Sequence, residues 1–154
     1  MNLNRKSALG LLLGLFLCIL GAKLFVIGHH GNPTPFWDQW DAEAASLYLP
    51  LAEGNLDLAE LIAPHNEHRI LWTRLLGMLE LKLNGGIWDP LFQMVVNAGI
   101  HGLAILLLLF GLRKELPQGA FVPLVLFSLI LGVPFGWENT LAGFQSQFYF
   151  LLLF

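Results

Sequence analysis

Two aspartates, Asp38 and Asp41, stand three residues apart in an aromatic stretch that reads PFWDQWDAEAASLY. If this stretch is helical, the two carboxylates project from one face as like charges close together. Such a pair can bind a divalent cation or supply a general base. The alternative is an N-capping aspartate that opens a solvated acidic turn, with the neighbouring tryptophans as anchors at the membrane interface.

A second group of ionisable residues, His65, Glu67, His68 and Arg69, follows in the stretch PHNEHRI. The two imidazoles can face one site, Glu67 can orient a ligand or accept a hydrogen bond, and Arg69 can hold an anionic group through two parallel hydrogen bonds. The stretch lacks the HExxH spacing of a zincin metalloprotease. The alternative is a helix start with a polar first turn after the proline.

A third polar stretch, Trp137 to Gln147, separates two apolar segments. Glu138 lies close to the expected membrane boundary, so it can complete a site with the earlier carboxylates or cap the end of a helix. The alternative is a polar hairpin turn between two spans, in which Gln145 and Gln147 need hydrogen-bonding partners.

These residues belong to a chain with the composition of an integral membrane protein. Apolar residues make up 56% of the sequence and charged residues only 12%, with a mean hydropathy of +0.65, which is outside the usual balance of a soluble domain. We therefore expect an all-α fold, a polytopic bundle of membrane helices with a helical extracytoplasmic loop. The net charge of −3 gives no indication of a nucleic-acid partner.

Four apolar segments are candidates for the spans of one membrane domain over residues 1–154. Residues 7–28 and 90–112 reach the roughly 20 residues that a helix needs to cross a bilayer, and 119–136 is marginal. Residues 148–154 resemble the start of a fourth span. A helix that stops inside hydrocarbon leaves carbonyls unsatisfied, so we expect this sequence to be the N-terminal part of a longer chain.

The distribution of charge predicts the orientation of these spans. Arg5 and Lys6 precede the first span and Arg113 and Lys114 follow the second, whereas the segment between them, residues 29–89, is rich in Asp and Glu. The positive-inside rule places the N-terminus in the cytoplasm and loop 29–89 outside it. We expect Lys23, near the end of the first span, to extend its amine outward toward water.

Within loop 29–89 we expect two helices. Alanines and leucines from Asp38 onward favour a helix that ends by Pro50, and Glu53–Asn55 is typical of a loop. A second helix is predicted from about Asn66 to Leu83, where apolar residues recur along one side. That stripe suits a helix that lies on the membrane or against the bundle.

The order of these segments resembles the start of the GT-C-fold glycosyltransferases, polytopic enzymes that use polyprenyl-phosphate-linked sugars. Asp41-Ala42-Glu43 to Tyr48 is similar to the acidic first-loop motif of the dolichyl-phosphate-mannose mannosyltransferases and aminoarabinose transferases, in which an aspartate is the base. Ala42 interrupts the adjacent Asp-Glu pair of that motif, so the choice between Asp41 and Asp38 stays open. The PHNEHRI stretch is similar to one in bacterial membrane proteins of this general type.

The resemblance implies transfer of a sugar from a polyprenyl-phosphate donor to an extracytoplasmic acceptor at a bacterial inner membrane. Asp41, or else Asp38, would deprotonate the acceptor hydroxyl, while Arg69 with His65 or His68 would neutralise the departing phosphate. A divalent metal ion held by the carboxylates and imidazoles could do the same work.

Two alternatives from other classes remain open. One is a non-catalytic polytopic protein, such as a transporter or assembly subunit, whose acidic loop binds a partner or a cation. The other is a membrane hydrolase that uses His65, Glu67 and His68 around a metal ion.

Overall fold

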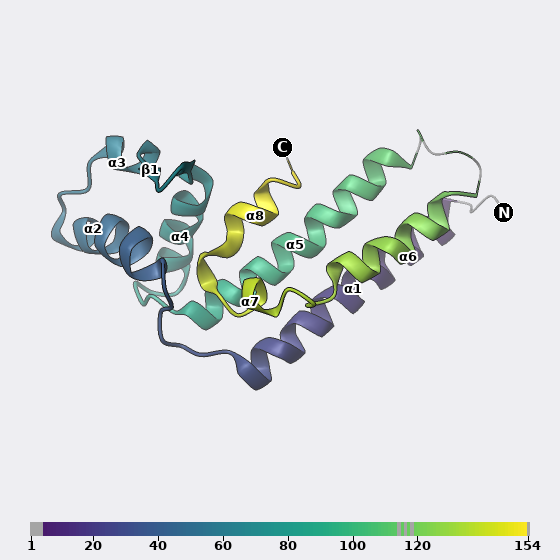
Figure 1. The fold of residues 1–154 in the computed structure, drawn as a ribbon, viewed down its shortest axis with the longest axis horizontal. Coiled ribbons are helices and arrows are strands. Elements are labelled where there is room, and N and C mark those ends of the chain that lie inside the picture. Colours follow the sequence, from purple (N-terminus) through teal and green to yellow (C-terminus); the bar gives the residue numbers. More distant parts are fainter. Residues whose placement is uncertain (1–4, 114, 116, 118, 154) are drawn as a thin grey trace.

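The computed structural model describes the whole chain except residues 1–4, 114, 116, 118 and 154. Lys114 and Phe154, which entered the orientation and the fourth-span predictions, therefore lie outside the described residues. The described part is mostly helical and contains one short β-hairpin, in agreement with the predicted all-α class. Figure 1 shows a long arm of helices at one end and a cluster of shorter elements at the other.

Two helices of the arm are long and apolar enough to cross a membrane. Helix α1 runs from Arg5 to His30 and α5 from Pro90 to Leu112. Asp89 caps α5 by accepting a hydrogen bond from the Leu91 amide at 2.9 Å, and Pro90 occupies the first turn, where its missing N–H costs nothing. The sequence pattern therefore fixes the start of α5 as well as its length.

The arm is held together by a seam of aliphatic side chains between α1, α5 and α6 (Phe121–Gly132). The buried members of this seam are Leu12, Leu15, Ile19, Ile105, Leu109 and Val125. Other large apolar side chains point away from it, and Leu9, Leu13, Phe25, Leu107 and Phe110 are each at least half exposed. An apolar outer surface of this kind suits contact with lipid.

Helix α6 is shorter than its apolar sequence suggests. It has 12 residues and ends because Val133, which precedes Pro134, is extended, as a residue before proline tends to be. Within the described residues, only α1 and α5 combine the length and the hydropathy of a membrane span. A full crossing at 119–136 and a fourth span from residue 148 stay predictions.

The first predicted helix of loop 29–89 is present but is wound differently and extends further. Residues Gln39–Tyr48 form a π-helix, η1, in which backbone partners stand five residues apart. It continues into α2 (Leu49–Glu53), so the prediction that the helix ends by Pro50 was wrong. Proline is tolerated there because it occupies the first turn of α2, and the left-handed Gly54 ends the helix inside the predicted loop.

The second predicted helix begins later than the sequence indicates. Helix α4 spans Leu71–Leu83, with Ile70 as its N-cap, and the residues before Ile70 form a hairpin of strands β1 (Pro64–His65) and β2 (His68–Arg69). Asn66 turns the chain with a φ of +51°, a left-handed conformation that asparagine tolerates better than most residues. A helix start at Asn66 was therefore a wrong prediction.

The remaining elements bring the end of the described chain back between the two regions. Short helices α3 (Leu58–Ile62) and α7 (Trp137–Thr140), the 3₁₀ turn η2 (Gly143–Gln145) and α8 (Ser146–Phe150) complete the fold. In Figure 1, α8 lies between α4 and α5, and it contacts both. Ser146 at its start donates a hydrogen bond to Thr73 of α4 at 3.0 Å.

Candidate functional site

Asp38, at the start of η1, lies in the wall shared by two neighbouring cavities. Its side chain is about half exposed, and it lines both cavities together with Trp37, Phe144 and Gln145. A carboxylate in this position is accessible to molecules that enter from either side.

The first cavity, called the basic cavity below, has a volume of about 410 Å³. The β1–β2 hairpin contributes His65, His68 and Arg69 to its wall. Helix α8 contributes an apolar side, formed by Phe148 and Phe150. The basic cavity therefore combines a guanidinium and two imidazoles with a hydrophobic surface.

The imidazole of His65 approaches the carboxylate of Asp38. His65 Nε2 lies 3.8 Å from Asp38 Oδ2. The rings of Phe144 and His65 are nearly perpendicular, with 5.5 Å between their centroids. His65 also pairs with His68 across the hairpin, so the antiparallel register sets both histidines beside the cavity.

The hairpin owes its position to an arginine that the sequence did not single out. Arg74 of α4 is buried, and its Nη1 donates hydrogen bonds to the carbonyl oxygens of Glu60 and Ala63, each at 2.6 Å. Because these carbonyls end α3 just before the hairpin, Arg74 joins α3 and β1 to α4.

The second cavity, called the Glu138 cavity, has a volume of about 630 Å³. His30 and Asn32 line it from the end of α1, and Trp137 and Glu138 line it from α7. The polar stretch that follows α6 thus meets the first loop. Glu138 faces Asp38 across a cavity and is not bonded to it.

Two of the predicted site residues lie apart from both cavities. Asp41 is exposed, and its backbone carbonyl accepts a hydrogen bond from Ser46 Oγ at 2.7 Å. Asp38 lines both cavities and Asp41 lines neither, so the structure does not bring the two carboxylates to one site. Glu67, at the tip of the hairpin, is also exposed and lines neither cavity.

The turn that presents Asp38 is strained. Trp37 has a φ of +50°, which is uncommon for a bulky residue with a Cβ. Its ring is largely exposed and contacts Phe36 edge to face. Non-glycine residues in this conformation cluster at binding and catalytic sites, where the surrounding structure holds them.

A buried hydrogen-bond network beneath this turn escaped the sequence analysis. It joins η1, α4 and α5 through Gln39, Glu43, Tyr48, Glu80 and Gln93. Burial raises the pKa of Glu43, although three side-chain hydrogen bonds oppose the shift. Burial, with the nearby charge of Glu43, raises the pKa of Glu80 to about 7. Burial and the same two carboxylates raise the pKa of Tyr48.

One signal in the sequence could have revealed this network. Gln93 and Asn97 stand in the first turns of an apolar run, where each amide needs a partner. Asn97 donates to the Gly143 carbonyl at 2.7 Å and Gln93 donates to Glu43. Pairing these amides with the carboxylates of the first loop would have required knowing that η1 packs on α5.

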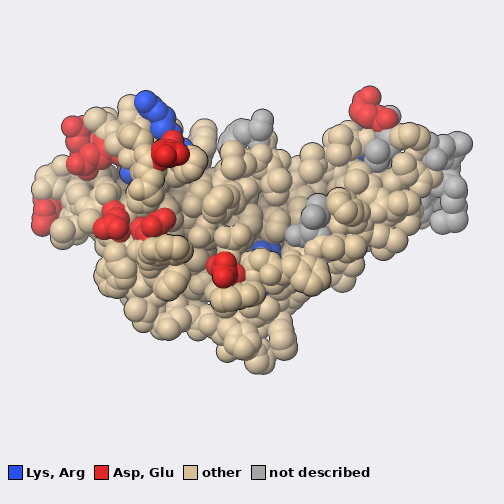
Figure 2. Space-filling model, in the orientation of Figure 1, with Lys and Arg blue, Asp and Glu red and all other residues tan. Residues whose placement is uncertain are grey.

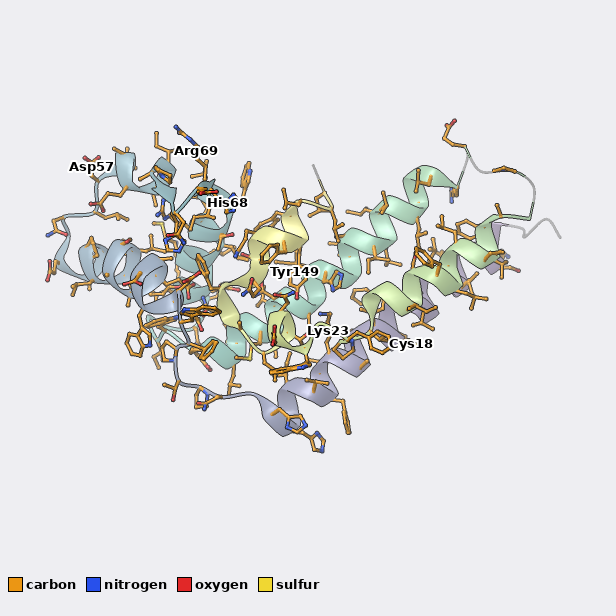
Figure 3. All side chains as sticks on the ribbon, viewed as in Figure 1. Cys18, Lys23, Asp57, His68, Arg69 and Tyr149 are labelled. Atoms are coloured by element: carbon orange, nitrogen blue, oxygen red, sulfur yellow. The ribbon has the colours of Figure 1, made fainter. Side chains whose placement is uncertain are left out.

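Lys23 does not extend toward water, so that prediction was wrong. Its side chain is only 3% exposed, and Nζ donates to Thr140 Oγ1 at 3.0 Å and to the Tyr149 hydroxyl at 3.4 Å. Figure 3 shows Lys23 and Tyr149 together in the middle of the molecule. The ammonium also lies 5.1 Å from the centre of the Tyr149 ring. Partners from α7 and α8 therefore draw the amine inward.

Among the described residues, no three His, Cys, Asp or Glu side chains are grouped so that they could hold a metal ion. Asp38 and His65 are the pair of potential ligands that the site brings together. Figure 2 shows that most Asp and Glu side chains in view lie over the end of the molecule that contains α2 to α4.

Comparison of the chain with models of protein families, with curated protein sequences and with solved structures gave no match.

Proposed function

We propose that this protein is a membrane enzyme that transfers a sugar from a polyprenyl-phosphate donor to a hydroxyl acceptor outside the cytoplasm. The observation that carries the proposal is the position of Asp38. Its side chain lines both cavities, and its Oδ2 lies 3.8 Å from His65 Nε2. Transfer of a glycosyl group needs a base for the acceptor and a separate place for a charged leaving group.

The basic cavity has the chemistry that a lipid-linked phosphate requires. Arg69 can hold a phosphate through two parallel hydrogen bonds, and His68 lines the same wall. The apolar side chains of Phe148, Phe150 and Leu151 on the opposite side suit the first isoprene units. One cavity can therefore receive both the phosphate of such a donor and the first isoprene units of its lipid at the membrane surface.

Asp38 is the better of the two candidate bases. It is open to both cavities, whereas Asp41 lines neither. In the proposed step the acceptor oxygen forms a bond to the anomeric carbon while the bond to the phosphate oxygen breaks. The proton of the hydroxyl passes to the Asp38 carboxylate, and the phosphate leaves with the electron pair beside Arg69.

We place this reaction at the outer face of a bacterial plasma membrane. Arg5, Lys6 and Arg113 lie at the ends of α1 and α5 that are remote from the site. The positive-inside rule assigns those ends to the cytoplasm and the acidic region to the outside. A divalent ion between Asp38 and His65 would neutralise phosphate charge in the same place, and the test below is run with and without added Mg²⁺.

The proposal is tested with purified protein in liposomes and a panel of undecaprenyl-phosphate sugars, with release of undecaprenyl phosphate as the measurement. We expect Asp38→Asn to reduce release at least ~100-fold, the range for loss of a general base. Asp41→Asn is the matched control and should stay within about threefold of the wild type, because a group outside both cavities contributes no general-base catalysis.

Binding of undecaprenyl phosphate alone gives a second measurement. Arg69→Ala should weaken it about tenfold or more, since a charge-assisted contact to phosphate is lost. Lys82→Ala removes an exposed positive charge from α4 that lines neither cavity and should leave binding unchanged. Equal release by the wild type, Asp38→Asn and Asp41→Asn proteins would reject the proposed role of Asp38.

A further inference from the structure

The network beneath Asp38 contains two buried carboxyl groups with unequal surroundings. Glu43 is 3% exposed and accepts hydrogen bonds from Gln39 Nε2 at 2.9 Å, from Gln93 Nε2 and from the Tyr48 hydroxyl at 3.3 Å. These three donors favour the charged form of Glu43, although burial still raises its pKa.

Glu80 lacks such support. It is 4% exposed, and one oxygen accepts only a long hydrogen bond, 3.5 Å, from Gln93 Nε2. The other oxygen, Oε1, is buried and has no partner within the described residues. A buried oxygen without a partner destabilises the folded protein when the carboxyl group is charged. Binding of a ligand that neutralises Glu80 would remove this cost in free energy.

No side chain in the described part of the chain supplies a charge that would neutralise Glu80, because neither Glu43 nor Glu80 forms an ion pair there. The titratable groups on the elements around the pair are Tyr48 and Asp41 on η1, Glu53 on α2, Glu60 on α3, Arg74 and Lys82 on α4, Asp89 before α5, His101 on α5 and Tyr149 on α8. Of these, Tyr48 bonds to Glu43, while Arg74 turns to the backbone of α3.

The orientation of the two amides favours a proton over a metal ion as the neutralising ligand. Gln93 Oε1 accepts hydrogen bonds from Trp88 Nε1 at 3.1 Å and from Gln39 Nε2 at 3.0 Å. Gln39 Oε1 accepts from the Phe36 amide at 3.1 Å. Both amides therefore point their N–H groups at the carboxylates, and such donors repel a cation.

The same bonds connect the carboxyl pair to the turn that carries Asp38. The bond from the Phe36 amide to Gln39 spans Trp37 and Asp38, and Gln39 is completely buried. Gly143 lies so close to Gln39 and Gln93 that a Cβ there would be 2.8 Å from Gln39 Nε2. The next residue, Phe144, contacts His65. A change at Glu80 can thus reach both partners of the Asp38–His65 contact.

We propose that Glu43 and Glu80 form a proton-binding site, in which Glu80 holds the proton, and that the occupied site positions the turn that presents Asp38. Asp38 as the base rests on the proposed function, whereas the proton site does not. Gln39, Gln93 and Glu80 are positioning residues in this scheme, because none of them lines either cavity. Loss of the proton leaves Glu43 and Glu80 both negatively charged around the amide of Gln93. The repulsion between them displaces the Gln93 side chain, and then the Gln39 side chain that is bonded to it.

Fluorine NMR of the purified protein with 5-fluorotryptophan tests the proton site without any substrate. Trp88 donates to Gln93 and reports on the network, and Trp37 reports on the turn. We expect the Trp88 resonance to titrate with a midpoint near pH 7, the pKa of Glu80, and the titration to vanish in Glu80→Gln. Glu60→Gln, which changes an exposed carboxyl of α3, is the matched control and should titrate as the wild type does.

The link to Asp38 has its own measurement. In the wild type, the Trp37 resonance should shift over the same pH range as the Trp88 resonance. Glu80→Gln should remove the part of the Trp37 shift that comes from Glu80. Gln39→Leu should remove the same part, because Gln39 connects the carboxyl pair to the turn. Because His65 lies against Asp38, the Trp37 response is always compared with that of the Glu80→Gln protein. A Trp37 response that survives in Gln39→Leu would rule out the proposed route.

Other results decide the proton site itself. A Trp88 resonance that does not move between pH 5.5 and 8.5, or one that still titrates in Glu80→Gln, would overturn it. If Glu80→Gln does not fold, Glu80→Asp keeps a titrating carboxyl and must shift the midpoint, and an unchanged midpoint counts against the site. These measurements can fail while Asp38→Asn still abolishes transfer, and they can succeed where no transfer is found.

Discussion

Two buried ionisable groups, Lys23 in the helical arm and Glu80 in the cluster of shorter elements, are both nearly hidden from solvent and differ in what surrounds them. Lys23 has two oxygen acceptors and the face of an aromatic ring. Glu80 has one long hydrogen bond and an oxygen without a partner in the described chain. A satisfied charge ties elements together, whereas an unsatisfied one responds to its surroundings. We therefore expect Lys23 to tie the helices of the arm together and Glu80 to make the cluster of shorter elements sensitive to pH.

The largest effect that we expect in this comparison comes from the contact between Gly143 and the amide pair. In Gly143→Ala, the new Cβ would lie 2.6 Å from Gln93 Oε1 and 3.1 Å from Gln93 Cβ, and buried neighbours leave no room to move. Overpacking of this kind costs about 3 kcal/mol. Thermal unfolding in detergent measures the loss, with Gly99→Ala as control, since a Cβ at Gly99 meets nothing within 4 Å. Equal melting temperatures would mean that the network is loosely packed.

Stability of the wild type should depend on pH through Glu80. Its pKa is raised from 4.5 to about 7 in the folded protein, so folding binds a proton. The stabilisation is complete below pH 4.5 and is lost as the pH rises through 7. The upper limit of the loss is about 3 kcal/mol. Melting temperatures measured from pH 5 to pH 8.5 should fall for the wild type and change little for Glu80→Gln, and a rise with pH would contradict the assignment.

Replacing each charge by an apolar or neutral group of similar shape gives the smallest effects and should give opposite signs. Lys23→Met removes charge-assisted bonds to Thr140 and Tyr149, and we expect it to destabilise the protein by about 2 kcal/mol. At pH 8, Glu80→Gln removes a poorly paired anion and should stabilise it by about 1 kcal/mol. Chemical unfolding in mixed micelles at pH 8 compares the two. The same sign for both would end the distinction between the regions.

The long elements could be predicted from the sequence because one property determines them. An uninterrupted apolar run fixes α1 and α5, and proline and aspartate set the start of α5. The winding of η1 and the hairpin at Asn66 could not be predicted in this way. Both replace an ordinary α-helix that local propensity favours, and the alternatives are selected by contacts with distant residues such as Gln93 and Phe144.

The candidate site shows the same division between local and distant information. Residue type and spacing singled out Asp38, His65, His68 and Arg69, which line one cavity, and Glu138, which lines the next. They left the choice between Asp38 and Asp41 open, because spacing does not show which side chain reaches a cavity. They also assigned Lys23 to the surface, because its partners Thr140 and Tyr149 lie more than a hundred residues away along the chain.

The π-helix η1 makes the length of the chain between Glu43 and Tyr48 a constraint in its own right. These two side chains are bonded because they stand five residues apart, which is the spacing of one π turn. Deleting either Ala44 or Ala45 would place the tyrosine four residues after Glu43, the spacing that faces one side of an ordinary α-helix, so this contact would no longer require the wide π turn. The winding of η1 is therefore matched to the number of residues between its two bonded side chains.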